Sequence, residues 1–357
     1  MLAFKYIALH YLKYFFIILI ALVLFWLGFD YMQHAEKLSK SANLLLIYFV
    51  YKSFFAIDML LPLALVFGMI TTKIFLIRSN ALVSFYSLGY SRVDVLKPFV
   101  VVATLISVIF IFLHSFNSFA RSAEYSMNIR NQGQYLSPTR DLFFTYEDQF
   151  VYFGQMLPLQ KRAIGIRVFG VKDNSLKEVL VAKKASYWDG YWHIKKADII
   201  TKPDNLGFDS KGMRVRSEKD LEILKGFKPK MLDQVYEGKV NFTIKDAFDA
   251  MRILDAQHVD TSSIKGALYK IFIYPLFVPC LVVIIFFFVP MSVRFLNVSV
   301  FSFVAILATL MIWGSLFALI ELANNKTIPS ELGVVAPVLI LFLIAIRQWR
   351  KYRLATS

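Results

Sequence analysis

The residues that could do chemistry are few, and none of them stands in a catalytic pattern. The chain has no G-x-x-x-x-G-K-[ST] loop for ATP, no H-E-x-x-H metal motif and no G-x-S-x-G nucleophile motif. Its histidines lack the spacing of metal ligands; they are His10, His34, His114, His193 and His258. We therefore expect a protein that has no catalytic residues, holds no metal and is not itself an enzyme.

Three lysines near the start of the chain are better candidates for a binding site. Lys37 and Lys40 follow the first apolar run of the sequence, and Lys52 stands at the start of the second. Cations at a membrane interface attract the phosphate groups of anionic lipids. The alternative is that all three are solvated interface lysines, as most such lysines are. A lipid-phosphate site at Lys37, Lys40 and Lys52 is therefore a hypothesis.

Two carboxylates lie close to the ends of apolar runs. Asp58 falls near one end of the second run, and Glu321 directly follows the fifth. A carboxylate in hydrocarbon is costly and by default suggests an ion path or a proton relay. Near the end of a span, however, its side chain can reach the headgroup layer, and we favour this interpretation. An ion-coupled carrier is therefore the weaker alternative.

The elements that must position these residues follow from an unusually apolar composition. Of the 357 residues, 57% are hydrophobic and 18% are charged, whereas soluble domains are about half apolar and about a quarter charged. A membrane helix needs about 20 mainly apolar residues. Suitable runs occur at Tyr14–Phe29, Ser53–Thr72, Phe99–Asn117, Ile271–Val289, Val298–Ile320 and Leu332–Ile346. We therefore expect six transmembrane helices.

Basic residues near the apolar runs predict the orientation in the membrane. If six spans alternate, Lys5, the loop from Arg78 to Lys97, Arg294 and the tail RQWRKYR share one side. The positive-inside rule places this side in the cytoplasm, together with both termini. The insert between the third and fourth runs then lies outside. The formal net charge of +15 does not favour nucleic acid as a partner, because basic residues of the insert are mixed with acidic ones.

Between residues 121 and 265 the sequence changes to the alternation that is typical of β-strands. The segment KEVLVAKKASYW precedes Asp189-Gly190, and YWHIKKADIITK follows it. This dipeptide favours a two-residue hairpin in which both residues have positive φ. Short strands without helices between them predict a sandwich or jelly roll. We therefore expect three spans in residues 1–120, an inserted β jelly-roll-like domain in 121–265, and three spans with a basic tail in 266–357.

The stretch between the second and third runs, RSNALVSFYSLGYSRVDVLKP, predicts a short helix over residues 79–89. Ser79 can cap its start, and Gly89 can end it in the left-handed conformation. The apolar side chains in between share one helical face; they are Leu82, Phe85 and Tyr86. A lone helix this short is marginal in water unless its apolar face is buried. We expect that face to lie on the membrane surface or in a groove of a partner.

The fifth apolar run contains small residues that permit close approach between helices. They are Ala305, Ala308, Gly314 and Ser315. Packing within the chain explains such a pattern. The functional alternative is a lateral gate, a seam between helices that opens sideways to the lipid.

Several motifs in a fixed order resemble the LptF/LptG permease family of the lipopolysaccharide exporter. LPLALVFGM followed by RSNALVSFYSLGYS is similar to the family's second span and cytoplasmic coupling helix. In the insert, DQFVYFGQM, IGIRVFG and YWHIKKADIITK stand in the order of the family's jelly-roll strands, and YKIFIYPLFVP resembles its fourth span. The likeness covers nearly the whole chain. FDYMQHAEKL and SLGYS resemble LptG slightly more than LptF.

The resemblance implies the permease subunit of an ATP-driven exporter that extracts lipopolysaccharide from the inner membrane of a Gram-negative bacterium. A sister permease would complete an LptF/LptG heterodimer, and LptC/LptA-like proteins would form a periplasmic bridge next to the periplasmic β domain. An LptB-like cytoplasmic ATPase dimer would bind ATP and Mg²⁺, so no cofactor is expected in this chain. Lipopolysaccharide would contact the three lysines, and the gate would include Ala305, Ala308 and Ser315. ATPase docking would involve Arg78, Leu82, Phe85, Tyr86, Gly89 and Arg92.

The sequence departs from the family at the docking helix. The acidic residue that is usual near the start of that helix falls at Ala81, and no carboxylate follows before Asp94. Docking would then rest on the apolar face or on Arg78 and Arg92. Two other classes are alternatives: a membrane-anchored receptor or assembly protein that displays a β domain, and an ion-coupled carrier. A cytoplasmic ATPase in complex with the chain would separate these classes from a permease.

Overall fold

The computed structural model describes most of the chain, in two compact units. The described residues are 2–36, 38, 41–130, 139–146, 149–157, 160–172, 175–203, 212–227, 243–255, 262–288, 298–325 and 327–354. The helical unit comprises Met1–Gln132, Asn241–Ala247 and Ser262–Ser357, and the β unit comprises Gly133–Val240 and Phe248–Thr261.

The helical unit contains six helices that are long and apolar enough to cross a membrane. Its longer elements are α1 (Leu2–His34), α2 (Ala42–Arg78), α4 (Arg92–Leu113), α9 (Ser262–Phe272), α10 (Phe277–Phe288), α11 (Val298–Asn324) and α12 (Ala336–Leu354). Its short elements are α3 (Ala81–Ser87), α5 (Asn117–Ala120), α6 (Ser122–Arg130), the 3₁₀ turn η1 (Tyr274–Leu276) and the π-helical turn η3 (Glu331–Val335). Helix α8 (Ile244–Asp255) follows the β strands in the chain. The predicted six spans are confirmed.

The fourth span is interrupted, because Pro275 and Pro279 cannot donate backbone hydrogen bonds to a continuous helix. It consists of α9, η1 and α10 in succession. At the far end of α10, the buried Lys73 of α2 donates a hydrogen bond to the carbonyl of Phe286. Its ammonium also lies 3.7 Å from the centre of the Phe286 ring. This contact satisfies a carbonyl that the end of α10 leaves without an intrahelical partner.

Helix α2 lies at the centre of the helical unit, and most of its span is buried. Helices α1 and α2 approach closely at Gly68, where an added Cβ would lie 3.0 Å from the Cα of Phe15. The hydroxyl of Tyr11 donates to the carbonyl of Leu65 at 2.9 Å and fixes the same pair of helices. In contrast, little of α1 is buried along its span, so most of its side chains face outward.

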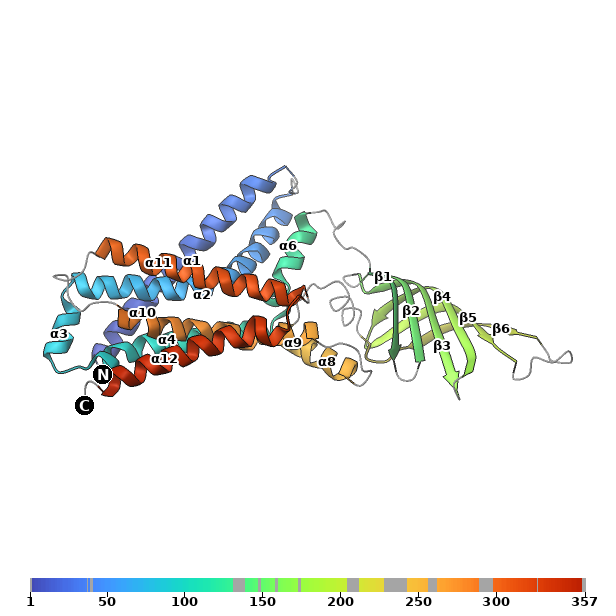
Figure 1. The fold of residues 1–357 in the computed structure, drawn as a ribbon. Coiled ribbons are helices and arrows are strands. Elements are labelled where there is room, and N and C mark those ends of the chain that lie inside the picture. The colour runs from blue at the N-terminus through green and yellow to red at the C-terminus, as the bar shows by residue number, and fades with distance from the viewer. Residues whose placement is uncertain are drawn as a thin grey trace. The chain divides into compact units, whose positions relative to one another are not determined.

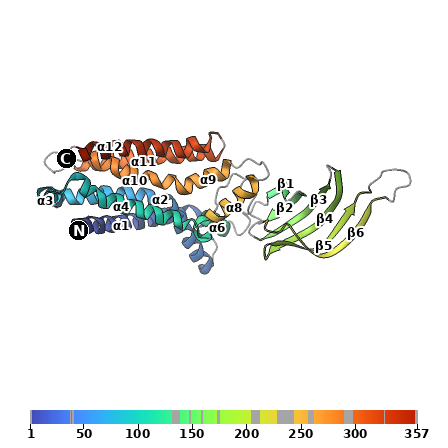
Figure 2. The ribbon, with the colours of Figure 1, turned by 90° about the horizontal axis from the view of Figure 1, so that it is seen from below.

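Different helices lie at the two ends of the helical unit. Figures 1 and 2 both show the start of α1 and the end of α12 close to α3, whereas α6 and α9 lie at the opposite end. We call these the α3 end and the α6 end. Helix α4 starts at the α3 end with a capping box, in which the Asp94 amide donates to the Ser91 hydroxyl at 3.1 Å.

The β unit is built around one six-stranded antiparallel sheet. Its strands are β1 (Thr139–Tyr146), β2 (Gln149–Leu157), β3 (Arg162–Lys172), β4 (Ser175–Trp188), β5 (Tyr191–Thr201) and β6 (Arg214–Ile223). They are neighbours in the sheet in the order of the chain. The inserted β domain is confirmed. Its described strands form a meander, and no crossover of the jelly-roll kind occurs among them.

The hairpin at Asp189-Gly190 has the predicted form. The two residues have φ of 49° and 83°, and Trp188 pairs with Tyr191 across the turn. The sheet buries one aromatic face, where the indole of Trp192 donates to the carbonyl of Phe227 at 2.9 Å.

The expected boundary at residue 121 differs from the division between the units. Helix α6 follows that residue and packs against α2 within the helical unit. There the rings of Tyr51 and Tyr125 have centroids 4.9 Å apart. Residues 262–265 also belong to the helical unit. The inserted region therefore begins and ends with helices that pack with the spans.

Candidate functional site

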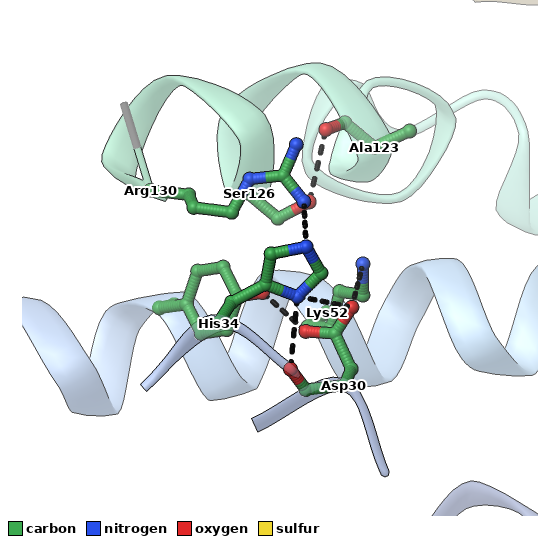
Figure 3. Close-up of polar contacts among 7 residues, drawn as sticks. Asp30, His34, Lys52, Ala123, Ser126 and Arg130 are labelled. Atoms are coloured by element: carbon green, nitrogen blue, oxygen red, sulfur yellow. Dashed lines mark hydrogen bonds and ion pairs between the residues drawn. The ribbon is translucent and has the colours of Figure 1, made fainter. Parts of the chain in front are cut away.

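A polar cluster lies at the α6 end, where α1, α2 and α6 meet (Figure 3). Asp30 and His34 are one turn apart on α1, and Tyr48 and Lys52 are one turn apart on α2. Arg130 is the last residue of α6. Residues four apart on a helix share a face, so α1 and α2 each present a pair of polar side chains and α6 adds one. We call these five residues the Asp30 cluster.

The centre of the cluster is an ion pair between Asp30 and Lys52. The Lys52 Nζ lies 2.7 Å from the Asp30 Oδ1, and the Tyr48 hydroxyl donates to the other carboxylate oxygen. Both charged side chains are about nine-tenths buried, with exposed fractions of 11% and 9% for Asp30 and Lys52. Buried charges of this kind are stable only when they are paired and hydrogen-bonded.

His34 links the ion pair to the second cation, Arg130. The Arg130 Nη1 lies 3.0 Å from the His34 Nε2, and a guanidinium can only donate. The Nε2 therefore accepts, and the proton of the neutral ring sits on Nδ1, which lies 2.9 Å from the Asp30 carbonyl. The Asp30 cluster thus holds two cations and one carboxylate, a net charge of +1 next to the chain's first turn between spans.

Among the predicted lipid-phosphate residues, Lys52 lies in this cluster with its ammonium already paired. Lys37 and Lys40 lie outside the described residues. Sequence reasoning missed Asp30, Tyr48 and Arg130. The signal for Asp30 was an acid at the end of an apolar run, one helical turn before a histidine.

The second polar pair at the α6 end joins Asp58 of α2 to His114, the residue after α4. The Asp58 Oδ1 lies 3.0 Å from the His114 Nε2, and the His114 Nδ1 lies 3.1 Å from the Phe110 carbonyl. We expected Asp58 to reach the headgroup layer, but the structure pairs it with a buried histidine instead. Glu321 is exposed and accepts from Asn324 at 3.2 Å. Both acids border a small cavity of about 170 Å³ with Lys270 and Tyr274.

At the opposite end, α3 is shorter than expected and starts differently. It spans Ala81–Ser87 with Asn80 before it at a φ of 57°, and no side chain caps its start. Ser79 belongs to the end of α2, where its hydroxyl donates to the Phe75 carbonyl at 2.8 Å. The expected cap at Ser79 is therefore wrong. The left-handed Gly89 is confirmed, with a φ of 86°.

The apolar face of α3 is covered by the chain's own helices. Leu82 is fully buried, and Phe85 and Tyr86 pack against the core of the helical unit. The ring of Phe85 lies 6.1 Å from that of Tyr6 in α1, and burial raises the pKa of Tyr86 to about 12. The expectation that this face needs a partner or the membrane surface to cover it is wrong for Leu82, because the turn after α2 folds α3 back onto the bundle. Phe85 and Tyr86 remain half-buried.

The outward face of the α3 loop carries other apolar side chains. Leu88 is 73% exposed, Val83 is 45% exposed and Tyr90 is 37% exposed. Arg78 is exposed at the end of α2, whereas Arg92 starts α4 and lies 5.6 Å from the ring of Tyr352 in α12. Val83 and Leu88 were missed because helical periodicity finds an apolar stripe more readily than single exposed residues.

The predicted gate residues on α11 differ in how far they are buried. Ala305 is buried, Ala308 is half-buried and Ser315 is exposed. An added Cβ at Gly314 would meet nothing within 4 Å. Some of these small residues therefore pack within the chain, and others lie on an outward face of α11.

One protein family has a model that matches the chain over residues 5–351, and its description is lipopolysaccharide export system permease LptF/LptG. The chain belongs to the LptF/LptG permease family. No individual curated protein matches it. The match covers both units, and it confirms the resemblance drawn from the motifs. This LptF/LptG chain is a multi-pass membrane protein of a family of permeases, not of enzymes, that serves lipopolysaccharide export.

Proposed function

We propose that this LptF/LptG chain is the transmembrane subunit of an ATP-driven exporter. It extracts lipopolysaccharide from the inner membrane of a Gram-negative bacterium and passes it to a periplasmic bridge toward the outer membrane. The observation that carries this proposal is the family match over residues 5–351, on a chain with six apolar helices and an inserted β sheet. The features that favour the LptG branch are the motifs FDYMQHAEKL and SLGYS.

In this proposal the energy comes from a partner. An LptB-like ATPase dimer in the cytoplasm binds ATP and Mg²⁺, and a homologous sister permease completes the membrane part. LptC/LptA-like bridge proteins continue from the periplasmic β unit. The α3 loop is the docking element for the ATPase, and its contact residues are Arg78, Val83 and Leu88, because these side chains are exposed. Docking by an apolar contact would also suit a loop with Ala81 in place of the family's acid.

Lipopolysaccharide phosphates are held at the α6 end in this proposal. The Asp30 cluster has a net positive charge, and Lys37 and Lys40 follow α1 directly in the chain. A phosphate attracted there would meet Arg130, while Lys52 keeps Asp30 neutralised. Lys37 and Lys40 stay part of the proposed phosphate site on the sequence alone. The lateral gate lies at the outward face of α11 that includes Ser315.

The orientation of the spans can be tested with reporter fusions. We expect a reporter inserted beside Gly89, or fused after Ser357, to be active in the cytoplasm, and one inserted at the Asp189-Gly190 turn to be active in the periplasm. The reason is the asymmetry of basic residues between the two sides. A cytoplasmic signal from the turn, where the chain folds as a tight exposed hairpin, would contradict the proposed arrangement.

A further inference from the structure

A long apolar groove runs between α4, α10 and α12 on a face of the helical unit that the proposed function does not use. Its volume is about 560 Å³, within the range of about 300–1,000 Å³ that is typical of ligand sites. Among the described residues, no charged side chain lines it. Its lining includes Val100 and Thr104 of α4, Cys280 and Val283 of α10, and Ala345 and Trp349 of α12.

The length of the groove suits a lipid chain. Its lining on the side of α12 extends from Val335 to Trp349, which is about 21 Å at a rise of about 1.5 Å per residue. One leaflet contributes about half of a hydrocarbon core of about 30 Å. The groove is therefore long enough to take an acyl chain through the whole depth of one leaflet.

Large, exposed side chains form the walls of the groove, and a small, buried side chain forms its floor. Leu339 and Phe342 are 52% and 49% exposed, whereas Ala345 between the walls is 6% exposed. Small side chains on a floor flanked by large ones produce a concave surface. An acyl chain in such a groove gains dispersion contacts from several sides, whereas a chain against a flat helix face gains them from one.

Cations stand at one end of the groove. On α12, Arg350 and Arg353 lie one helical turn beyond the lining residues Ile346 and Trp349. On α4, Lys97 precedes Val100 by three residues on the same face. All three basic side chains are exposed, and the Lys97 Nζ lies 2.7 Å from the Asp94 carboxylate. The start of α4 and the end of α12 both lie at the α3 end of the helical unit.

We propose that this groove binds an acyl chain of an anionic phospholipid, with the lipid phosphate held by Lys97, Arg350 and Arg353. Basic pockets between membrane helices are a recognised form of site for anionic headgroups. Here the basic residues and the apolar groove follow each other along the same helix faces, as the headgroup and chain of a phospholipid do. The site is separate from the Asp30 cluster, which lies at the other end of the helical unit.

Trp349 makes the proposal measurable, because it lies in the groove next to the cations. The full-length chain is reconstituted into phosphatidylethanolamine vesicles that contain, at equal mole fraction, either phosphatidylglycerol or phosphatidylethanolamine brominated on the acyl chain. Bromine quenches indole fluorescence on contact. The signal of Trp349 is the difference between the wild type and Trp349→Phe, since the chain has five tryptophans.

We expect brominated phosphatidylglycerol to quench the Trp349 signal at a concentration on the order of tenfold lower than brominated phosphatidylethanolamine, because three cations attract the anionic headgroup while Asp94 offsets part of their charge. Lys97→Gln, Arg350→Gln and Arg353→Gln together remove this preference. Ala345→Phe fills the floor and reduces quenching by both lipids. The matched control is Leu343→Phe on the same helix. Leu343 is 64% exposed and lies outside the groove, so this variant leaves quenching unchanged.

Three outcomes would overturn the proposal. Equal quenching by the two brominated lipids would mean that bulk lipid fills the groove without recognition. No quenching by either lipid would mean that a protein segment covers it. Equal effects of Ala345→Phe and Leu343→Phe would show that the groove itself is not where the lipid binds.

Discussion

A permease that carries both Val83→Asp and Leu88→Asp is expected to lose its cytoplasmic ATPase while it still inserts and pairs with its sister chain. These side chains are exposed on the α3 loop, and burial of an apolar side chain of this size contributes about 1.5–3 kcal/mol. The loss of two such contacts weakens binding on the order of 100-fold or more. A pull-down of the ATPase with the solubilised permease measures the effect.

The matched control places the same charges elsewhere. Met213 and Val215 of the β unit are likewise exposed, at 75% and 66%, and their replacement by Asp should leave the ATPase bound. Phe85 and Tyr86 are unsuitable for this test, because they are half-buried and pack against the core of the helical unit, so that their replacement would disturb the permease itself. Retention of the ATPase by the Val83→Asp, Leu88→Asp variant would show that the α3 loop is not the docking element.

The second large effect is expected at the Asp30–Lys52 ion pair. Lys52→Gln leaves the Asp30 carboxylate buried without its cation, and breaking a buried pair in this way costs about 3–5 kcal/mol. The matched control is Lys97→Gln. Lys97 and Asp94 are also 2.7 Å apart, but their side chains are 55% and 40% exposed, so its loss should cost about 0–1 kcal/mol. Thermal or denaturant unfolding of the purified permease measures both.

A double variant separates stability from lipid binding. Asp30→Asn together with Lys52→Gln removes both charges, and it should recover most of the stability lost in Lys52→Gln. If lipopolysaccharide-stimulated ATP hydrolysis of the complex also returns, Lys52 serves only to neutralise Asp30. If stability returns and stimulation does not, the Lys52 charge acts on the lipid. Equal stability of Lys52→Gln and Lys97→Gln would contradict the structural role assigned to the buried pair.

The six spans were predictable because hydrophobic length is a local property of the sequence. The structure extends α1 and α2 well beyond their apolar runs, since Lys13 and Lys52 are tolerated within them. The covering of the Leu82–Phe85–Tyr86 face was not predictable. Periodicity shows that a face is apolar, but the neighbours that pack against it, here Tyr6 of α1 and the core of the helical unit, depend on how the turn after α2 folds back.

The same limit holds in the sheet and at the Asp30 cluster. Asp189-Gly190 predicted a hairpin correctly because a two-residue turn depends on its own backbone angles. The order of the strands depends on pairing between distant segments, and alternation alone does not specify it. Asp30 and Lys52 stand on different helices, and Arg130 joins them from a third. Only the fold of the helical unit brings these charges together.

We propose that this LptF/LptG chain moves lipopolysaccharide with energy from a separate ATPase. The most direct measurement reconstitutes the permease with its sister chain and the ATPase in vesicles that contain lipopolysaccharide, and follows transfer to a soluble periplasmic acceptor by photocrosslinking. We expect transfer that requires ATP and stops when the ATPase is omitted. Transfer that proceeds without ATP, or that follows an imposed proton gradient in the absence of the ATPase, would contradict it.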